Sequence, residues 1–265
     1  MTTPIGAGEA RERPRSLSVI IPIYNEEEIL RDTVERVVTG VRTFGLDTFE
    51  VILCENGSTD STLAIAHSLA EEVDEVKVVA LDEPDYGSAM RAGFLAASGE
   101  AIVNFDADYY DLTFLEAALG VDADIVVAAK GLLDSHDARV LSRRVVSRSF
   151  GWLVRHILNV RVSETHGMKV FRRRAIAGIL LEVRSRKDIF DTELIARAEW
   201  AGLRIGELPI TTVEMRHSRS GIIRRIPRTM WGLVRMRLLA RAAHAVRVRP
   251  DLSAPSAAQA FDAAA

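Results

Sequence analysis

Residues 17–23 have the sequence LSVIIPI and are followed by YNEE, and this stretch decides the fold class. A nearly unbroken apolar run of this length is typical of a strand that is covered on both faces. Asn25 and Glu28 have the spacing of an N-cap and its capping box, which predicts that a helix begins at Asn25. Apolar residues then recur at helical spacing, namely Leu30, Val34, Val37, Val38, Val41 and Phe44. The stretch therefore predicts a strand, a turn and an amphipathic helix.

The same unit recurs along the chain. Apolar runs at 49–53, 76–81, 101–105 and 125–129 predict further strands, with one helix beginning at Asp60 and another at about 89–97. Later patterns predict helices at 142–159 and 190–201, the second ended by Gly202, and short strands at 168–171, 205–208 and 211–214. Strands that alternate with helices predict an α/β domain with a mostly parallel sheet and helices on both faces. Ligands of such sheets bind beyond the carboxyl ends of the strands.

Composition and length favour one globular domain. The chain has 265 residues, of which 48% are hydrophobic and 27% charged, as in ordinary globular proteins. We expect flexible tails at 1–15 and 250–265, the domain at 16–215 and a basic amphipathic helical segment at 216–249. No run reaches ~18 consecutive apolar residues, so no membrane-spanning helix is expected. The single cysteine, Cys54, is interpreted as a buried hydrophobe in a protein of the reducing cytoplasm.

Polar residues follow three of the predicted strands. They are PIYNEE at 22–27, ENGSTDST at 55–62, and Asp106-Ala107-Asp108. Because the carboxyl ends of parallel strands meet at one edge of a sheet, these segments should converge. Two carboxylates separated by one residue suit Mg²⁺ or Mn²⁺, with diphosphate oxygens and water completing the coordination shell. Such an ion would neutralise the charge on a leaving nucleoside diphosphate.

These segments resemble those of glycosyltransferase family 2, and specifically its polyprenyl-phosphate sugar synthases, the dolichyl-phosphate mannose and glucose synthase group. The resemblance covers about residues 16–220 and includes YGSAMRAG at 86–93, HGMKVF at 166–171 and FDTEL at 190–194. It implies the GT-A fold, a nucleotide-diphosphate sugar as donor, and direct inverting displacement at the anomeric carbon. It does not specify the sugar.

The resemblance also implies residue roles. Nucleotide-sugar contacts fall on Pro22, Tyr24, Glu26, Glu55, Gly87, Arg216 and Arg219. Asp106 would lie against the nucleotide and Asp108 would bind the metal, while Lys130, Arg143 and Ser147 would hold an acceptor phosphate. Asp191 is the candidate base, although an acid that opens a helix also suits the helix dipole. Tyr110 stands where the family commonly has a glutamine ligand, so Asp111 or a water would take that place.

Positive charge is concentrated towards the carboxyl end of the chain, although the net charge is only −3. Residues 216–249 contain ten arginines and no acidic residue, with apolar residues and Trp231 between them. This pattern is typical of an interfacial helix that lies on an anionic membrane. Packing of the apolar face on the domain or on a homodimer partner is the alternative. No aromatic stacking platform or recognition motif supports nucleic-acid binding.

The acceptor determines whether the reaction needs a base. A phosphate monoester has its second pKa near ~6, so it is mostly a dianion at neutral pH and can attack unaided. A hydroxyl acceptor needs a general base, for which Asp191 is the candidate. The leading hypothesis is a metal-dependent inverting transferase that moves a hexose from a UDP- or GDP-sugar to a polyprenyl phosphate at the cytoplasmic membrane face. Transfer to a soluble hydroxyl acceptor and a non-catalytic nucleotide-sugar-binding module are the alternatives.

Overall fold

The computed structural model describes residues 12–82, 84–129, 151–165, 167–185, 189–210 and 232–238. The strands are β1 (Ser16–Ile23), β2 (Thr48–Asn56), β3 (Val76–Leu81), β4 (Ala101–Asn104), β5 (Ile125–Ala129), β6 (Lys169–Arg172) and β7 (Ile205–Pro209). The helices are α1 (Leu30–Arg42), α2 (Thr62–Glu72), α3 (Tyr86–Ala96), α4 (Leu112–Leu119), α6 (Arg173–Glu182) and α7 (Phe190–Trp200). Residues 151–158 and 232–238 are also helical.

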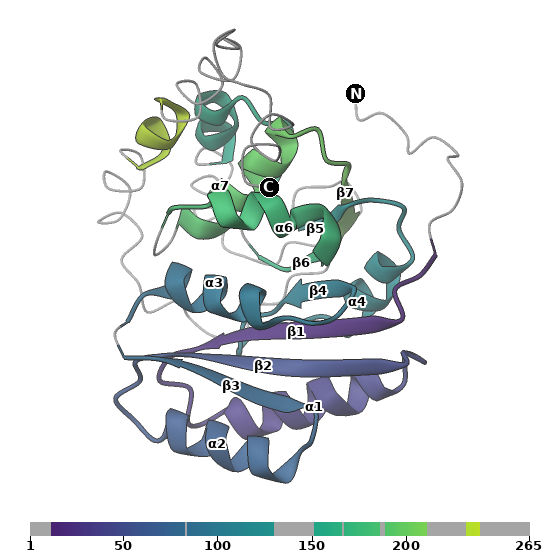
Figure 1. Ribbon diagram of the computed structural model, residues 1–265, viewed down its shortest axis with the longest axis vertical. Coiled ribbons are helices and arrows are strands. Elements are labelled where there is room, and N and C mark those ends of the chain that lie inside the picture. Colours follow the sequence, from purple (N-terminus) through teal and green to yellow (C-terminus); the bar gives the residue numbers. More distant parts are fainter. Residues whose placement is uncertain are drawn as a thin grey trace, which may run out of the picture.

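The described strands form one seven-stranded sheet in the order β3-β2-β1-β4-β6-β5-β7 (Figure 1). β6 runs antiparallel to both of its neighbours, β4 and β5, whereas the other neighbouring pairs are parallel. The predicted α/β fold with a mostly parallel sheet is therefore confirmed. No helix within the described ranges combines the length and the apolarity needed to cross a bilayer.

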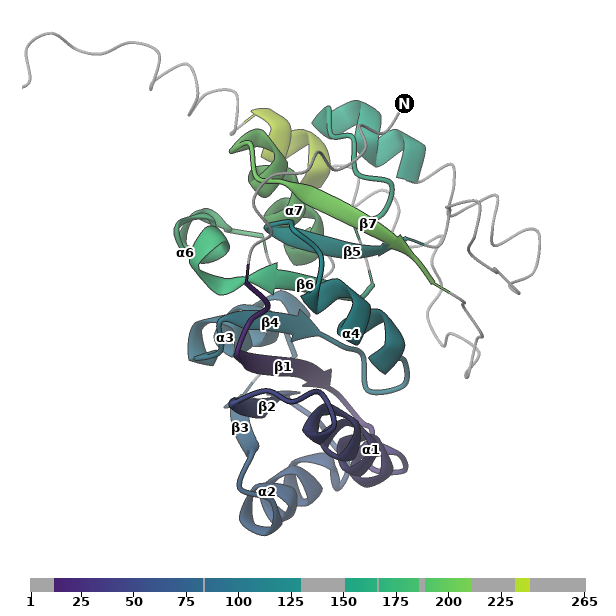
Figure 2. The same ribbon diagram turned by 90° about the vertical axis from the view of Figure 1, so that its right-hand side faces the viewer.

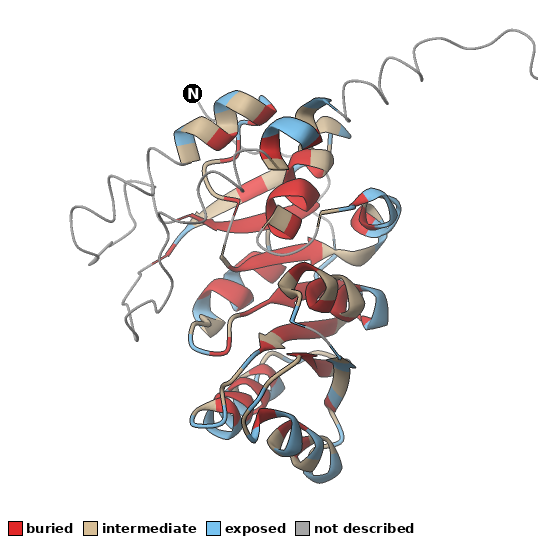
Figure 3. Ribbon diagram, turned by 90° about the vertical axis from the view of Figure 1, so that its left-hand side faces the viewer, coloured by how far each residue is buried: buried red, intermediate tan, exposed pale blue. Residues whose placement is uncertain are grey.

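Each face of the sheet has its own hydrophobic core, because successive residues of a strand point to opposite faces. In β1, Val19 and Ile21 belong to the core formed with α1 and α4, while Ile20 belongs to the core formed with α3, α6 and α7. Figure 2 shows α1 and α4 on one side of the sheet and α3 and α6 on the other. Figure 3 shows the strands buried between these helices, which explains the unbroken apolar runs of the sequence.

The predicted N-cap at Asn25 is wrong. Helix α1 begins at Leu30, its N-cap is Ile29, and no side chain caps it. Asn25 has a φ of 55°, and its side chain accepts from the next loop rather than from its own helix. The carbonyl oxygen of Glu26 accepts from the backbone nitrogens of Ile29 and Leu30, so a turn intervenes between strand and helix. Tertiary contacts between two loops have overridden the local capping signal.

Two helices, α4 and α6, were not predicted. Both are short, and α4 (LTFLEAAL) has little polar sequence to give it a helical period. The one local signal is Asp111, whose side chain caps α4 by accepting from the backbone nitrogen of Phe114 at 3.0 Å. Both helices lie in segments between predicted elements, where the sequence pattern predicted neither a helix nor a strand. They do not change the fold class.

The amino-terminal end of the sheet is closed by a buried carboxylate. Glu50 on β2 accepts from Ser18 Oγ at 2.6 Å, from Ser98 N and Oγ at 2.7 Å, and from Lys77 Nζ at 2.6 Å. Burial raises the pKa of Glu50, but the bonds from Lys77, Ser18 and Ser98 outweigh it and lower this pKa to about 2. This network joins β1, β2 and β3 at the end of the sheet opposite to the polar loops.

Residues 232–238 are the described part of the predicted basic segment at 216–249, and they show how this part contacts the domain. Leu233 and Met236 are buried in the core that contains α7, while Val234, Arg235 and Leu238 are exposed. One face of this helix therefore packs on the domain. The predicted tails at 1–15 and 250–265 and the basic segment at 216–249 lie mostly outside the described residues, as does the predicted strand at 211–214, so these boundaries stay predictions.

Candidate functional site

The loops that follow β1 and β2 are joined by hydrogen bonds between side chains and backbone. The backbone nitrogen of Asn25 donates to Ser58 Oγ at 3.0 Å, and Asn25 Oδ1 accepts from the backbone nitrogen of Thr59 at 2.8 Å. The backbone nitrogen of Glu26 donates to Thr62 Oγ1 at 2.8 Å. These bonds bring together the polar segments that follow the first two strands, as their positions in the sequence predicted.

Glu55 shapes the second of these loops. Its side chain is buried, with the residue only 2% exposed. Its two carboxylate oxygens accept from the backbone nitrogens of Gly57 at 3.0 Å and Ser58 at 2.5 Å. Gly57 has a φ of 71°, a left-handed conformation that glycine adopts readily, so the chain can curl around the carboxylate. The role of Glu55 toward the base or ribose stays a prediction.

Other predicted nucleotide-sugar residues lie along the same edge of the sheet. Pro22 is half-buried near the end of β1, and Tyr24 follows it with 45% of its surface exposed. Gly87 is buried in the first turn of α3. This helix is capped by Asp85, whose side chain accepts from the backbone nitrogen of Ser88 at 3.1 Å. The edge therefore combines an exposed aromatic ring with a capped helix start.

Asp106 lies on a tight turn that begins where β4 leaves β1. The backbone nitrogen of Phe105 donates to the carbonyl oxygen of Ile20 at 2.9 Å. Two residues after Ile20 along β1, Pro22 faces β4 in the same way. Proline has no backbone N–H, so the hydrogen bonds between β1 and β4 cannot continue there. The chain then turns, and Asp106 and Tyr109 exchange two backbone hydrogen bonds of 3.1 Å. The pairing of β1 with β4 therefore ends just before Asp106 and Asp108.

The turn presents two carboxylates in different environments. Asp106 is half-buried and Asp108 is exposed. Between them, the carbonyl oxygen of Ala107 accepts from Thr33 Oγ1 at 2.8 Å, which holds the turn against α1. Carboxylates are the hard oxygen ligands that Mg²⁺ and Mn²⁺ prefer, so the pair fits such an ion if a diphosphate and water complete the shell. The described part of the chain has no group of three or more His, Cys, Asp or Glu side chains placed to hold a metal.

Asp111 is committed elsewhere, because its side chain caps α4. Tyr110, which stands in place of the family's glutamine, packs its ring against Phe105 with centroids 6.0 Å apart. Burial raises the pKa of Tyr110 above its ordinary value, with Arg36 opposing the shift. Tyr110 is therefore a neutral phenol at physiological pH, and whether Asp111 or a water takes the place of the family's glutamine stays a prediction.

A second polar cluster lies beyond β4, on the face covered by α3 and α7. Lys169 is fully buried, and its Nζ donates to the carbonyl oxygen of Gly167 at 2.7 Å and to Asp191 Oδ1 at 3.3 Å. The Tyr86 hydroxyl donates to Asp191 Oδ2 at 2.9 Å. Asn104, which pairs with Lys169 across β4 and β6, donates from Nδ2 to Gly167 at 3.2 Å. Both oxygens of Asp191 are thus engaged.

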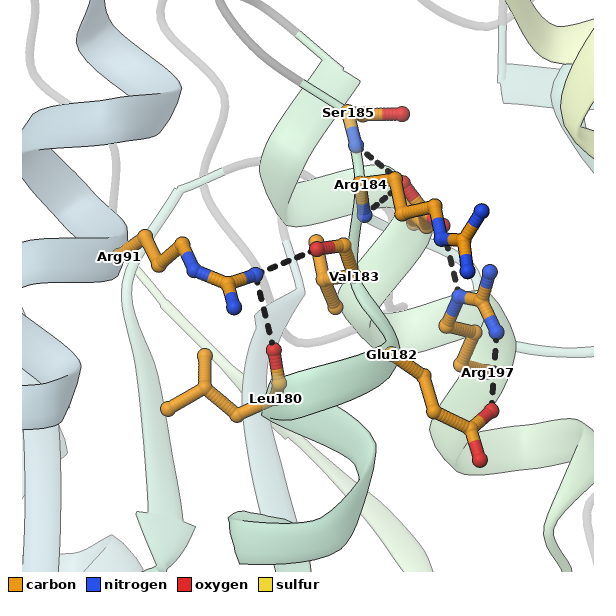
Figure 4. A network of polar contacts seen from close by, with 8 residues as sticks. Arg91, Leu180, Glu182, Val183, Arg184, Ser185 and Arg197 are labelled. Carbon is orange, nitrogen blue, oxygen red and sulfur yellow. Dashed lines mark hydrogen bonds and ion pairs between the residues drawn. The ribbon is translucent and has the colours of Figure 1, made fainter.

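A buried carboxylate holds the chain that leads into α7 (Figure 4). Glu193 accepts from the backbone nitrogens of Arg184 at 3.2 Å and Ser185 at 2.7 Å, and from Arg197 Nε at 2.6 Å. Arg197 also donates to Glu182 at 3.0 Å. Glu193 therefore has a structural partner set, and it fixes the first turn of the helix that carries Asp191.

Arg91 extends this network to α3. Its guanidinium donates to the carbonyl oxygens of Leu180 and Val183 at the end of α6 (Figure 4). Carbonyl groups in the last turn of a helix have no partner within that helix, so a cation is well placed there. Helices α3, α6 and α7 are consequently linked by charged groups as well as by the core.

Five predicted site residues lie outside the described residues, namely Lys130, Arg143, Ser147, Arg216 and Arg219. Their roles stay predictions. The sequence reasoning missed Tyr86, Lys169 and Asn104 as members of the cluster at Asp191. A signal was present for two of them, because Asn104 and Lys169 interrupt otherwise apolar runs, AIVNF and MKVF. A polar residue in a strand covered on both faces needs a buried partner.

Comparison with known sequences gives several matches. The family model described as "Glycosyl transferase family 2" matches residues 18–176. Glycosyltransferase AglD of Haloferax volcanii is 32% identical over 241 residues, which cover 85% of this chain and 39% of that protein. Dolichyl-phosphate beta-glucosyltransferase of Drosophila melanogaster is 29% identical, over 77% of this chain and 68% of that protein. Undecaprenyl-phosphate 4-deoxy-4-formamido-L-arabinose transferase of Salmonella paratyphi B is 27% identical, over 65% and 53%. The chain thus spans only part of the length of these relatives.

Solved structures share the fold. Glucosyl-3-phosphoglycerate synthase from Mycobacterium tuberculosis in complex with phosphoglyceric acid gives a TM-score of 0.55 at 19% identity, over 84% of this chain and 80% of that chain. A mannosyltransferase from Pyrobaculum calidifontis in complex with GDP-Man and Mn²⁺ gives 0.54 at 21% identity, over 92% and 66%. At these identities the likeness establishes the architecture alone.

Proposed function

Because the chain belongs to glycosyl transferase family 2 and has the GT-A fold, we propose that it transfers a hexose from a UDP- or GDP-sugar to a polyprenyl phosphate. The observation that carries this proposal is the turn at Asp106 and Asp108, which lies at the sheet edge beside the interlocked loops after β1 and β2. Two of the relatives are named for transfer to dolichyl phosphate and undecaprenyl phosphate, which motivates the choice of acceptor.

The parts of the donor would follow the order of the strands. The nucleoside would lie at the loops after β1 and β2, near Tyr24. The diphosphate would lie at Asp106 and Asp108, where a bound divalent cation supplies charge neutralisation for the leaving nucleoside diphosphate. The hexose would then point away from β1 toward β6 and the first turn of α7, where Asp191 lies. An acceptor that attacks from that side, opposite to the leaving diphosphate, would invert the configuration of the anomeric carbon.

The contacts of Asp191 support a phosphate acceptor over a hydroxyl. One oxygen accepts from the buried ammonium of Lys169, and the other accepts from the Tyr86 hydroxyl. Taking up a proton would neutralise the partner of a buried ammonium, which is costly in a site without solvent. A phosphate dianion needs no base and needs cations to hold it. Lys130 and Arg143 are the candidate cations on the acceptor side.

Two variants separate the acceptor classes. With Mn²⁺, UDP-glucose or GDP-mannose, and undecaprenyl phosphate in detergent, we expect Asp108→Ala to abolish metal-dependent transfer and Asp191→Asn to retain substantial activity. A thermal-shift comparison of UDP, GDP and their sugars with and without Mn²⁺ identifies the donor first. Because Asp191→Asn leaves the buried Lys169 ammonium without its carboxylate and so lowers stability, its folding at the assay temperature is checked by circular dichroism. If folded Asp191→Asn is as inactive as Asp108→Ala, the phosphate-acceptor proposal fails. Turnover of a soluble hydroxyl acceptor without lipid would then support the alternative.

The proposal places one end of the molecule at an anionic lipid surface. Helix 232–238 exposes Val234, Arg235 and Leu238, the last with 61% of its surface exposed. Helix 151–158 exposes Trp152 and lies at the same end of the molecule in Figures 1 and 2. Apolar side chains beside arginines suit the interface of an anionic bilayer. Co-sedimentation with vesicles that contain anionic lipid should weaken in Leu238→Asp, and equal binding of this variant would contradict the placement.

A further inference from the structure

Asn104 carries a buried acceptor that no described residue satisfies. The residue is 3% exposed, and its Oδ1 has no hydrogen-bond partner within the described part of the chain. Its Nδ2 donates to the carbonyl oxygen of Gly167 at 3.2 Å. A carbonyl oxygen only accepts, so turning the amide over would place two oxygens against each other. Oδ1 is therefore the unpaired atom, and a buried polar atom without a partner lowers the stability of the protein.

An unpaired donor lies beside this acceptor. Lys169 is opposite Asn104 across β4 and β6, so the two side chains are neighbours on the same face of the sheet. The ammonium of Lys169 has three N–H groups. They bond to the carbonyl oxygen of Gly167 at 2.7 Å and to Asp191 Oδ1 at 3.3 Å, which leaves one N–H without a partner among the described residues. A spare donor and a spare acceptor therefore stand side by side.

A hydroxyl group fits this pair. Its oxygen can accept from the ammonium, and its hydrogen can be donated to the amide oxygen. A carbonyl or carboxylate has no hydrogen for Asn104, and an ammonium has no lone pair for Lys169. The hydroxyl of Tyr86 already donates to Asp191 Oδ2 at 2.9 Å, so it does not supply this group. Water and the hydroxyls of a sugar share the required chemistry.

The cluster lies where the proposed function places the hexose. Asn104 is the last residue of β4, two positions before Asp106. Lys169 and Asp191 belong to β6 and the first turn of α7, toward which the hexose would point from the diphosphate. The cluster is buried, but Tyr86 and Gly167 at its margin are half-buried, so a hydroxyl would approach between them.

We propose that Asn104 is a specificity-determining residue for the donor, with its Oδ1 accepting from one hexose hydroxyl whose oxygen accepts in turn from Lys169. This inference rests on the proposed function, because it concerns the sugar of that same donor. In the free protein Oδ1 is already removed from water, so the new bond does not replace a bond to water. A donor that lacks this hydroxyl would leave both groups unpaired and would bind more weakly.

Binding measurements separate the hexose from the nucleotide. Isothermal titration calorimetry with Mn²⁺ compares UDP with UDP-glucose and GDP with GDP-mannose, in the unmodified chain and in Asn104→Leu. In this variant the Kd for the nucleoside diphosphate should stay within about twofold, while the Kd for the nucleotide sugar should rise about tenfold, equivalent to about 1.4 kcal/mol. The melting temperature without ligand should rise, because the unpaired acceptor is gone.

A control variant and a set of modified donors identify the contact. Thr192 is 2% exposed, lies next to Asp191, and shares a hydrogen bond of 3.1 Å with the hydroxyl of Thr165. Thr192→Val therefore also removes a buried polar atom from this region, but it should change neither Kd. Among donors that each lack one hexose hydroxyl, one should bind the unmodified chain about tenfold more weakly than its parent. In Asn104→Leu, that donor should bind as well as its parent.

Each result decides the inference. An unchanged Kd for the nucleotide sugar in Asn104→Leu would overturn it, as would equal weakening for the nucleoside diphosphate. Equal binding of all the modified donors to the unmodified chain, with a lower melting temperature of Asn104→Leu, would mean that water fills the pair. If Asn104→Leu does not fold, Asn104→Val provides the same comparison. The proposed function fails as well only if the unmodified chain neither binds nor transfers from any nucleotide sugar, so the two failures are distinguishable.

Discussion

Replacing Lys169 by methionine tests whether the buried ion pair with Asp191 holds β6 and α7 together. The side chain of Lys169 is 0% exposed and that of Asp191 is 5% exposed, so the two charges are compensated by each other rather than by water. Methionine fills much of the same volume but carries no charge. The substitution therefore leaves a buried carboxylate without its ammonium partner.

The expected cost follows from the contacts that remain. Removing one member of a buried pair costs about 3–5 kcal/mol. Asp191 would still accept from the Tyr86 hydroxyl at 2.9 Å, and the carbonyl oxygen of Gly167 would still accept from Asn104. We therefore expect the lower end of that range, about 3 kcal/mol. For a domain of this size that corresponds to a fall in melting temperature of roughly 6–12 °C.

Urea unfolding followed by circular dichroism measures this loss, provided that the m-value is unchanged. The double variant Lys169→Met with Asp191→Asn replaces both charges, and it should recover most of the lost free energy of unfolding. Arg36→Met is the control for an exposed pair, because Arg36 and Asp32 lie on the surface of α1, and it should have no measurable effect. A loss below about 1 kcal/mol in Lys169→Met, or a double variant no more stable than the single one, would refute the reasoning.

Three further predictions follow from other parts of the molecule. Asp108→Ala should remove the Mn²⁺-dependent thermal stabilisation by UDP or GDP without lowering the melting temperature of the free protein, because Asp108 is exposed; stabilisation equal to the unmodified chain would contradict its role. Glu50→Gln should destabilise the protein at pH 7 but hardly at pH 2. The pKa of Glu50 falls from about 4.5 to about 2 on folding. The contribution of the ionised carboxylate to the free energy of unfolding is therefore complete above about pH 4.5 and is lost as the pH falls to about 2. Asn104→Leu should stabilise the protein by about 1–3 kcal/mol. The reason is that Asn104 Oδ1 has no hydrogen-bond partner among the described residues, while the carbonyl oxygen of Gly167 still accepts from Lys169 Nζ after the substitution. A lower urea midpoint would contradict this prediction.

Several elements of the fold could be predicted because their signals are local. The predicted strands at 76–81 and 125–129 coincide with β3 and β5, and Gly202 ends α7 with a φ of 80°. The start of α1 could not be predicted, because the residues that bind Asn25 come from the loop after β2, more than thirty positions away. The antiparallel direction of β6 likewise depends on the path taken by the chain between β5 and β6.

The positions of Asp106 and Asp108 were also easier to predict than the surroundings of Asp191. Asp106 and Asp108 directly follow a strand, so the sheet edge places them without further information. Asp191 was placed at a helix start, but its partners Lys169 and Tyr86 come from β6 and α3, and no sequence spacing connects them. Contacts between distant segments are what the sequence pattern leaves undetermined.

Polar residues inside apolar strands can nevertheless be sorted by their place along the strand. Ser18 and Glu50 lie near the amino ends of β1 and β2, and their hydrogen bonds stay within the structural network there. Asn104 lies at the carboxyl end of β4, where ligands of parallel sheets bind. Lys169 is the first residue of β6, but β6 runs antiparallel to β4, so Lys169 lies at that same edge of the sheet, opposite Asn104. The direction of a strand thus decides at which edge of the sheet a buried polar residue lies, and Lys169 lies at the edge that carries the candidate site.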